Sequence, residues 1–274
     1  MTRLRNLFFL LIGIYLCILI FVYFYQDHLL FFPDGTRFSD CQLANQLGFQ
    51  TIETQYQNQK IRYHLKTDPK ALANIIVFHG NASTSCRNLA VYLALKSLRL
   101  NFVLAAYPGY EGDHLDKPGE AIFLKNGEAL FDYIKRQSYG KLPTFLFGRS
   151  LGTGEAVYLA SVRPVEGLIL QTPYSSISEV GAYHYPFLPI SLINQNVFPA
   201  YIWAPDVKSP VLLLHGTNDQ TIPFRYAQKL AQLFKAQVKV VKIEGAGHDD
   251  ITTWGNGIFW KEIGDFLRRL TPQN

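Results

Sequence analysis

The chain has 274 residues, of which 48% are hydrophobic and 17% are charged, and its formal net charge is +5. This composition is typical of a folded globular protein and excludes an intrinsically disordered one. The positive charges form no run of Lys and Arg, so they predict no nucleic-acid partner, although an excess of this sign suits an anionic membrane surface.

The first predicted element is an apolar segment from Leu7 to Tyr25, which has 19 residues and no charge. A helix of that length is close to the roughly 30 Å of a bilayer's hydrocarbon core. A cleaved signal peptide is the alternative, but its apolar region is about 7 to 15 residues long and ends in small residues. This segment ends FVYFYQD, without a cleavage site. Residues 1–25 are therefore predicted to be an uncleaved transmembrane anchor.

The charges that flank this segment predict its orientation. Arg3 and Arg5 precede it and Asp27 follows it, so the positive-inside rule places the N-terminus in the cytoplasm and the rest of the chain on the non-cytoplasmic side. That compartment would permit a disulfide between Cys41 and Cys86, but neither cysteine has a neighbour that fixes its geometry, and the pairing stays open. The cysteines form no CxxC pair and have no histidines at ligand spacing, so neither a metal site nor a redox dithiol is expected.

Residues 26–48 are predicted to connect the anchor to a catalytic domain at 49–274. In that domain short apolar runs rich in β-branched residues alternate with longer helical stretches, a pattern typical of a mostly parallel sheet with helices on both faces. The predicted strands are Phe49–Tyr56, Lys60–Lys66, Asn74–Phe78, Asn101–Ala106, Thr144–Phe147, Gly167–Leu170, Val211–Leu214 and Val238–Ile243. The predicted helices are Ser85–Leu98, Gly119–Gln137, Leu151–Val162, Pro223–Lys235 and Gly257–Leu270.

The stretch from Thr172 to Asp206 interrupts this alternation, because it is rich in proline and aromatic residues. We interpret it as a short cap insertion over the carboxyl edge of the sheet. Its apolar side chains either line an acyl pocket or cover the sheet edge as core. In the first case kcat/KM would rise from acetyl towards medium-chain esters, and Phe187→Asp would flatten the rise.

A GxSxG motif at residues 148–152 lies between a predicted strand and a predicted helix. Such a turn exposes its serine as a nucleophile, and the crowded backbone requires flanking glycines. Ser150 is therefore the candidate nucleophile, against the alternative of a helix-capping serine in a glycine-rich turn. A serine hydroxyl needs a base, and His248 follows the last predicted strand, on a loop from which its imidazole can reach Ser150.

The third group is expected to be a carboxylate on the loop after the preceding strand, and Asp219 stands there. The chain order is then Ser, Asp, His, and Asp219 would orient the imidazole of His248. The alternative is that Asp219 only caps the next helix. Asp249, Asp250 and Glu244 are near His248 in sequence but badly placed to orient its ring from behind.

Negative charge that develops on a substrate carbonyl oxygen needs hydrogen-bond donors. The candidate oxyanion-hole donors are the backbone N–H groups of Leu151, after the nucleophile, and of Asn81, in the sequence His79-Gly80-Asn81-Ala82. We interpret His79 itself as a structural residue at a strand end.

Together, the motifs HGNA, YPGYEG, GRSLGTG, HGTNDQTIP and GAGHDD resemble those of the α/β-hydrolase superfamily in content, spacing and order, over roughly residues 49 to 270. The anchor followed by QDHLLFFP is similar to single-pass membrane-anchored α/β-hydrolase-domain proteins, which are related to esterases, thioesterases and serine aminopeptidase-like hydrolases. The resemblance implies a mostly parallel eight-stranded sheet, no cofactor and acyl-enzyme chemistry. Glu155 departs from the pattern, since an apolar residue is expected there.

These observations predict a membrane-anchored serine hydrolase of ester or thioester bonds, acting on a small-molecule or lipid-like acyl substrate. Amide hydrolysis is the alternative within catalysis. A non-catalytic protein that keeps the fold as a binding module is the alternative outside it. The physiological substrate and the oligomeric state do not follow from the sequence.

Overall fold

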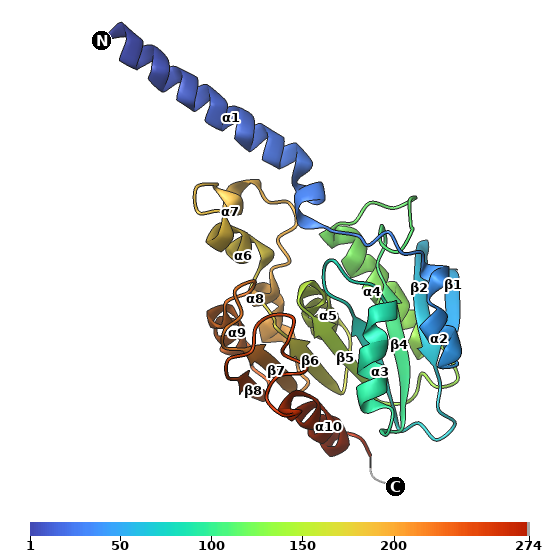
Figure 1. The fold of residues 1–274 in the computed structure, drawn as a ribbon. Coiled ribbons are helices and arrows are strands. Elements are labelled where there is room, and N and C mark those ends of the chain that lie inside the picture. The colour runs from blue at the N-terminus through green and yellow to red at the C-terminus, as the bar shows by residue number, and fades with distance from the viewer. Residues whose placement is uncertain (273–274) are drawn as a thin grey trace.

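The computed structural model describes residues 1–272, and most of them surround one eight-stranded sheet with helices on both faces (Figure 1). The strand order is β1-β2-β4-β3-β5-β6-β7-β8. Strand β2 pairs antiparallel with β1 and β4, whereas all later neighbours pair in parallel, so the predicted mostly parallel sheet is confirmed. The strands are β1 Gln50–Tyr56, β2 Gln59–Lys66, β3 Ala73–Phe78, β4 Leu100–Ala106, β5 Thr144–Arg149, β6 Gly167–Gln171, β7 Val211–Gly216 and β8 Val238–Ile243.

Each predicted strand matches an observed one to within two residues at either end. The predicted helix Ser85–Leu98 begins as a 3₁₀ turn, and the helix predicted at Pro223–Lys235 is shorter than expected. The helices are α1 Thr2–Leu30, α2 Gln42–Gln46, α3 Leu89–Leu95, α4 Glu120–Lys135, α5 Leu151–Val162, α6 Ile177–His184, α7 Ile190–Ile193, α8 Ala200–Trp203, α9 Phe224–Ala231 and α10 Ile258–Leu270, with 3₁₀ turns η1 Phe38–Asp40, η2 Cys86–Asn88 and η3 Ala204–Asp206.

The central strands are buried on both faces, which is why they are continuous apolar runs in the sequence. All six residues of β3 are buried, and successive side chains point to opposite faces. Ile76 and Phe78 join the core cluster that also contains α4 and α5, whereas Ile75 and Val77 join the cluster that contains α3 and α10. The sheet therefore lies between two cores, one on each face, and these cores fix the position of its carboxyl edge.

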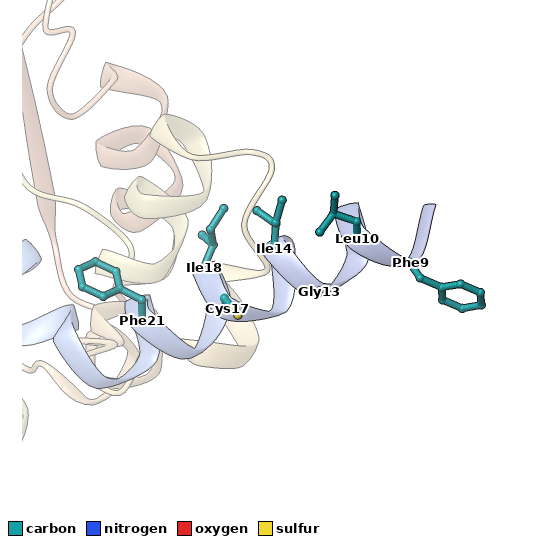
Figure 2. Close-up of a pocket in the computed structure, with 7 residues that line it drawn as sticks. All are labelled: Phe9, Leu10, Gly13, Ile14, Cys17, Ile18 and Phe21. Atoms are coloured by element: carbon teal, nitrogen blue, oxygen red, sulfur yellow. The ribbon is translucent and has the colours of Figure 1, made fainter. Parts of the chain in front are cut away.

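Helix α1 projects from the domain as a single long rod (Figure 1). It is long and apolar enough to cross a membrane, and the most apolar part of it is not buried against the domain. The helix passes the predicted end of the anchor at residue 25 and stops at Leu30, and the next residue, Phe31, is buried in the core. Figure 2 shows an apolar hollow along the exposed part of α1, lined by Phe9, Leu10, Gly13, Ile14, Cys17, Ile18 and Phe21.

The pairing of Cys41 and Cys86, left open by the sequence, is a disulfide in the structure, with a Cα–Cα distance of 5.7 Å. It fastens the segment between α1 and β1 to η2, which follows β3. Cys17 on α1 is a free, exposed cysteine.

The cap insertion contains α6, α7 and α8, and its parts differ in burial, so neither interpretation of the sequence describes all of it. Ile177 and Val180 of α6 pack partly buried against the core, but α7 has no buried residue and does not cover the sheet edge as core. Phe187 is 65% exposed and Leu192 is 83% exposed, so they do not line an enclosed acyl pocket either. Tyr174, Phe198, Ala200 and Ala204 of the same insertion are buried in the core cluster that contains α4 and α5, so this part of the insertion does cover the sheet as core.

Candidate active site

Ser150 occupies the sharp turn between β5 and α5. Its φ is +49° and its ψ is −116°, a conformation that costs a non-glycine residue on the order of 1–3 kcal/mol. The turn is held by the Ser150 N–H, which donates to the Gln171 carbonyl at 2.9 Å, and by Thr153, whose N–H and Oγ1 both donate to the Ser150 carbonyl.

The two glycines of the motif are required by close backbone approach. A Cβ at Gly148 would lie 2.5 Å from the Gly152 carbonyl oxygen. A Cβ at Gly152 would lie 2.6 Å from the His79 carbonyl oxygen. Any other residue at either position would push apart the strand, the helix and the neighbouring loop, and with them Ser150.

The structure brings Ser150, His248 and Asp219 together at the carboxyl edge of the sheet. His248 Nε2 lies 3.0 Å from Ser150 Oγ, and His248 Nδ1 lies 2.7 Å from Asp219 Oδ2. With the proton on Nδ1 donating to Asp219, Nε2 is free to accept the serine proton. The arrangement can raise the nucleophilicity of Ser150, as general-base catalysis requires.

Asp219 is almost fully buried, and four donors surround its carboxylate. Oδ1 accepts from the backbone N–H groups of Thr221 at 2.9 Å and Ile222 at 2.8 Å, while Oδ2 faces His248 and His215. Burial alone would raise the pKa of Asp219, but the hydrogen bonds from His215 and His248 outweigh it and bring that pKa below its usual value. Asp219 is therefore a carboxylate at any pH near neutrality.

The sequence did not single out His215 as part of the site. Its Nε2 lies 2.7 Å from the Ile222 carbonyl and 3.2 Å from Asp219 Oδ2, so one N–H can serve both oxygens. His215 is fully buried at the end of β7, four residues before Asp219. The only sequence signal was this short spacing within HGTND.

The other sequence candidates for the acid make different contacts. Asp249 pairs with Arg149 at 3.1 Å, on the surface, and Asp250 accepts the Gly247 N–H. Glu244 accepts a hydrogen bond from the Thr217 hydroxyl. Asp219 alone among the four carboxylates contacts His248 in the described residues 1–272.

The loop that contains Gly80 and Asn81 lies beside Ser150, because a Cβ at Gly80 would be 3.5 Å from the Ser150 Cβ. Within residues 1–272, the backbone N–H groups of Asn81 and Leu151 donate to no protein acceptor. Both are therefore available to a ligand oxygen. His79 is fully buried, and burial lowers its pKa to about 4, so it stays neutral while its Nδ1 bonds the Gly80 carbonyl.

The side chain of Asn81 ties this loop to the end of α1. Its Nδ2 donates to the Leu30 carbonyl at 2.6 Å, and its Oδ1 accepts from the Phe32 N–H at 3.0 Å. The same Oδ1 accepts the Tyr110 hydroxyl at 2.6 Å. These contacts join three segments that are far apart in the chain, and no local motif in the sequence indicated them.

Within residues 1–272, no group of three or more His, Cys, Asp or Glu side chains is arranged to hold a metal ion.

Comparisons with known proteins concern the family and the fold of the chain. The family model described as TAP-like protein matches residues 197–274. The protein Rv2307c of Mycobacterium tuberculosis is 27% identical over 236 residues, which cover 85% of this chain and 84% of that protein. The lysophosphatidylserine lipase ABHD12 of Mus musculus is 32% identical over 183 residues, which cover 58% of this chain and 44% of the lipase, so the match spans less than half of its length.

Solved structures give the same result for the fold. Est1E of Butyrivibrio proteoclasticus, determined with ferulic acid bound, has a TM-score of 0.67 at 16% identity and covers 80% of this chain and 98% of its own. The monoacylglycerol lipase of Paleococcus ferrophilus has a TM-score of 0.61 at 20% identity, covering 78% and 100%. The chain has the α/β-hydrolase fold and belongs to the α/β-hydrolase superfamily, as its motifs predicted.

Proposed function

We propose that the chain is a membrane-anchored serine hydrolase that cleaves carboxylic ester or thioester bonds. The observation that carries the proposal is the relay from Ser150 through His248 to the buried Asp219, with contacts of 3.0 and 2.7 Å. Relatives and structural neighbours named as esterases and lipases support ester hydrolysis as the reaction class.

In the proposed reaction Ser150 Oγ attacks the substrate carbonyl carbon while its proton passes to His248 Nε2. The tetrahedral intermediate collapses, the alcohol or thiol leaves with the proton from His248, and the acyl group stays on Ser150. Water then attacks the acyl-enzyme as His248 takes its proton, and this second intermediate collapses, releasing the acid while His248 returns the proton to Ser150 Oγ. Asp219 keeps the imidazole in the required tautomer and stabilises the imidazolium form.

The backbone N–H groups of Leu151 and Asn81 are the proposed oxyanion hole. Both donors are free of protein acceptors within residues 1–272, and Leu151 begins helix α5, whose positive end points at the site. Each such donor contributes about 2.7–4 kcal/mol to transition-state stabilisation in related chemistry.

The anchor and its orientation are part of the proposal. Helix α1 is exposed and apolar over the length that a bilayer requires, and Arg3 and Arg5 at its start favour a cytoplasmic N-terminus. The Cys41–Cys86 disulfide supports a catalytic domain on the non-cytoplasmic side, because disulfides persist in oxidising compartments. A site tethered to a bilayer favours lipid-like acyl substrates, which agrees with the activity in the name of the lipase ABHD12.

A fluorophosphonate probe, which reacts with activated serines, tests the mechanism on the full chain in detergent. Ser150→Ala should abolish labelling and turnover of p-nitrophenyl esters. Ser161→Ala is the matched control, because Ser161 lies on the same helix and its hydroxyl bonds the Tyr158 carbonyl instead. Labelling of the Ser150→Ala protein at the wild-type level would refute the assignment. Faster turnover of aminoacyl arylamides than of the esters would favour amide hydrolysis.

A further inference from the structure

The exposed outer part of the cap insertion lacks the charged groups that water-facing surfaces carry. From residue 180 to residue 205 the sequence has no Asp, Glu, Lys or Arg. Nevertheless α6 and α7, which fall largely in this stretch, have no buried residue. A soluble surface has charges mixed among its apolar groups, so this stretch is not built to face water.

The most exposed part is the tip of the insertion, which we define as residues 185–193, YPFLPISLI. Tyr185 is 54% exposed, Phe187 is 65% exposed and Leu192 is 83% exposed. These are large apolar or amphipathic side chains, and they lie on neighbouring turns of the same short segment. Removing large apolar side chains from water is favourable, so the tip has a strong tendency to be covered.

The tip lies beside the apolar part of α1, and this contact indicates what covers it. The Tyr15 hydroxyl donates to the Phe187 carbonyl at 2.7 Å. Tyr15 is ten residues before Tyr25, where the apolar segment ends. At 1.5 Å per residue this is about 15 Å along the helix, or roughly one leaflet of a 30 Å hydrocarbon core. A bilayer around α1 therefore reaches the tip as well.

Polar contacts between α1 and the insertion occur at the other end of the tip. Gln26 Nε2 donates to the Ile193 carbonyl at 3.1 Å, and the Gln195 N–H donates to Gln26 Oε1 at 2.6 Å. Asn196 Nδ2 donates to Asp27 Oδ1 at 2.7 Å. Polar residues thus meet just beyond the apolar segment of α1, and the apolar tip lies alongside that segment, as an interface between headgroups and hydrocarbon requires.

The backbone of the tip is also suited to an environment without water. Pro186 and Pro189 have no N–H group to satisfy. The N–H groups of Leu188, Ile190 and Leu192 donate to carbonyls within the tip, and that of Tyr185 donates to the Gly181 carbonyl. Irregular backbone that faces lipid is unfavourable unless its polar groups are satisfied, and most of those in the tip are.

We propose that the tip is immersed in the leaflet nearest the catalytic domain and forms a second membrane contact beside α1. The occupant of this surface is lipid. The proposal rests on the proposed anchoring of α1 in a membrane, and it gives the catalytic domain a fixed orientation on the bilayer. It also brings part of the chain segment that follows β6, which begins beside Ser150, into contact with the lipid phase.

Depth-dependent quenching tests this proposal on the full chain. An environment-sensitive NBD group is attached in detergent to Phe187→Cys in a Cys17→Ser background, without reductant, and the protein is reconstituted into phosphatidylcholine nanodiscs. Lipids brominated at different acyl positions should quench the group and its emission should be shifted to the blue. Lys96→Cys is the control, because this exposed residue lies just before β4, at the opposite edge of the sheet, and should not be quenched.

Labelling the native Cys17 on α1, in the otherwise unchanged chain, distinguishes the proposed anchor from the proposed immersed tip. Quenching at Cys17 together with quenching at residue 187 supports both. Quenching at Cys17 without quenching at residue 187 overturns the immersed tip but leaves the anchor intact. Absence of quenching at Cys17 overturns the anchor and the tip together, while fluorophosphonate labelling of the same samples reports separately on the catalytic assignment.

Discussion

Glu155→Gln should change how the stability of the domain depends on pH. Glu155 lies on α5, five residues after Ser150, and is 2% exposed. Its Oε2 has no hydrogen-bond partner within residues 1–272. The side chain fits against Gly127 of α4, where a Cβ would lie 2.5 Å from Glu155 Oε1. Burial raises the pKa of Glu155 well above its usual value, so the native domain holds this carboxyl group protonated.

The sign of the effect follows from proton linkage. Below the unfolded pKa of about 4.3 both states are protonated and Glu155 imposes no penalty. At higher pH the unfolded chain releases the proton and the native domain keeps it, so stability falls by about 1.4 kcal/mol per pH unit until the raised native pKa is reached. Glutamine has a similar shape and no proton to release, so Glu155→Gln removes this loss.

Thermal unfolding of both proteins from pH 5 to pH 8, in one detergent, measures the difference. One kcal/mol corresponds to roughly 2–4 °C in Tm for a domain of this size, so the advantage of the variant should grow by about 3–6 °C per pH unit. Glu166→Gln is the control, because Glu166 is an exposed residue between α5 and β6, and its profile should follow the wild type. Parallel curves for Glu155→Gln and the wild type would refute a buried, protonated Glu155.

Two further predictions concern His215 and the disulfide. His215→Phe removes one donor to Asp219, at a cost of about 1.5 kcal/mol for a hydrogen bond to a charged group, so kcat should fall about tenfold with little change in KM. Without the His215 donor the Asp219 carboxylate is more basic, so the acid limb of the kcat/KM profile should move to higher pH. An unchanged limb would contradict a role of His215 in positioning Asp219. Replacing Cys41 and Cys86 by serine opens a loop with a sequence separation of 45 and should cost about 4 kcal/mol of unfolding free energy, measured as a lower Tm. In cells both thiols should resist alkylation until they are reduced, and free thiols there would argue for a cytoplasmic domain.

The strands could be predicted from the sequence because a strand that is buried on both faces is a continuous run of apolar residues. Strands β3, β5, β6 and β7 are apolar along almost their whole length, and turn residues separate them from the helices. The start of the predicted helix Ser85–Leu98 was less accurate. Ser85 there donates to Glu111 through both its N–H and its hydroxyl, and Cys86 is held in the disulfide, so tertiary contacts decide the geometry of that turn.

The proposed triad was accessible to sequence reasoning because each member lies in a short motif at the end of a strand. Parallel strands bring those ends to one edge, so chain order alone predicts proximity of Ser150, Asp219 and His248. The exposed insertion was not accessible in the same way. An apolar segment such as residues 185–193 is compatible with a pocket, with a core or with lipid, and only its contacts distinguish them.

The side-chain role of Asn81 could not be predicted either, and it changes how the anchor is understood. Its hydrogen bonds reach Leu30 and Phe32, which lie 51 and 49 residues away in the chain. Between them Phe31 is 2% exposed and packs edge to face against Phe123, with ring centroids 5.4 Å apart. The residue that directly follows α1 is therefore built into the core of the domain.

This connection relates the position of the bilayer to the chemistry of the proposed site. The backbone N–H of Asn81 is the proposed second oxyanion donor, and its direction depends on a loop that the Asn81 side chain holds against the end of α1. An oxyanion donor stabilises a transition state only when it is positioned in advance, because reorganisation during the reaction would cancel its contribution. A helix that a membrane holds in place is a rigid support for such a donor. In the proposed arrangement the anchor thus does more than tether the domain, since the segment that follows it contacts the loop beside Ser150.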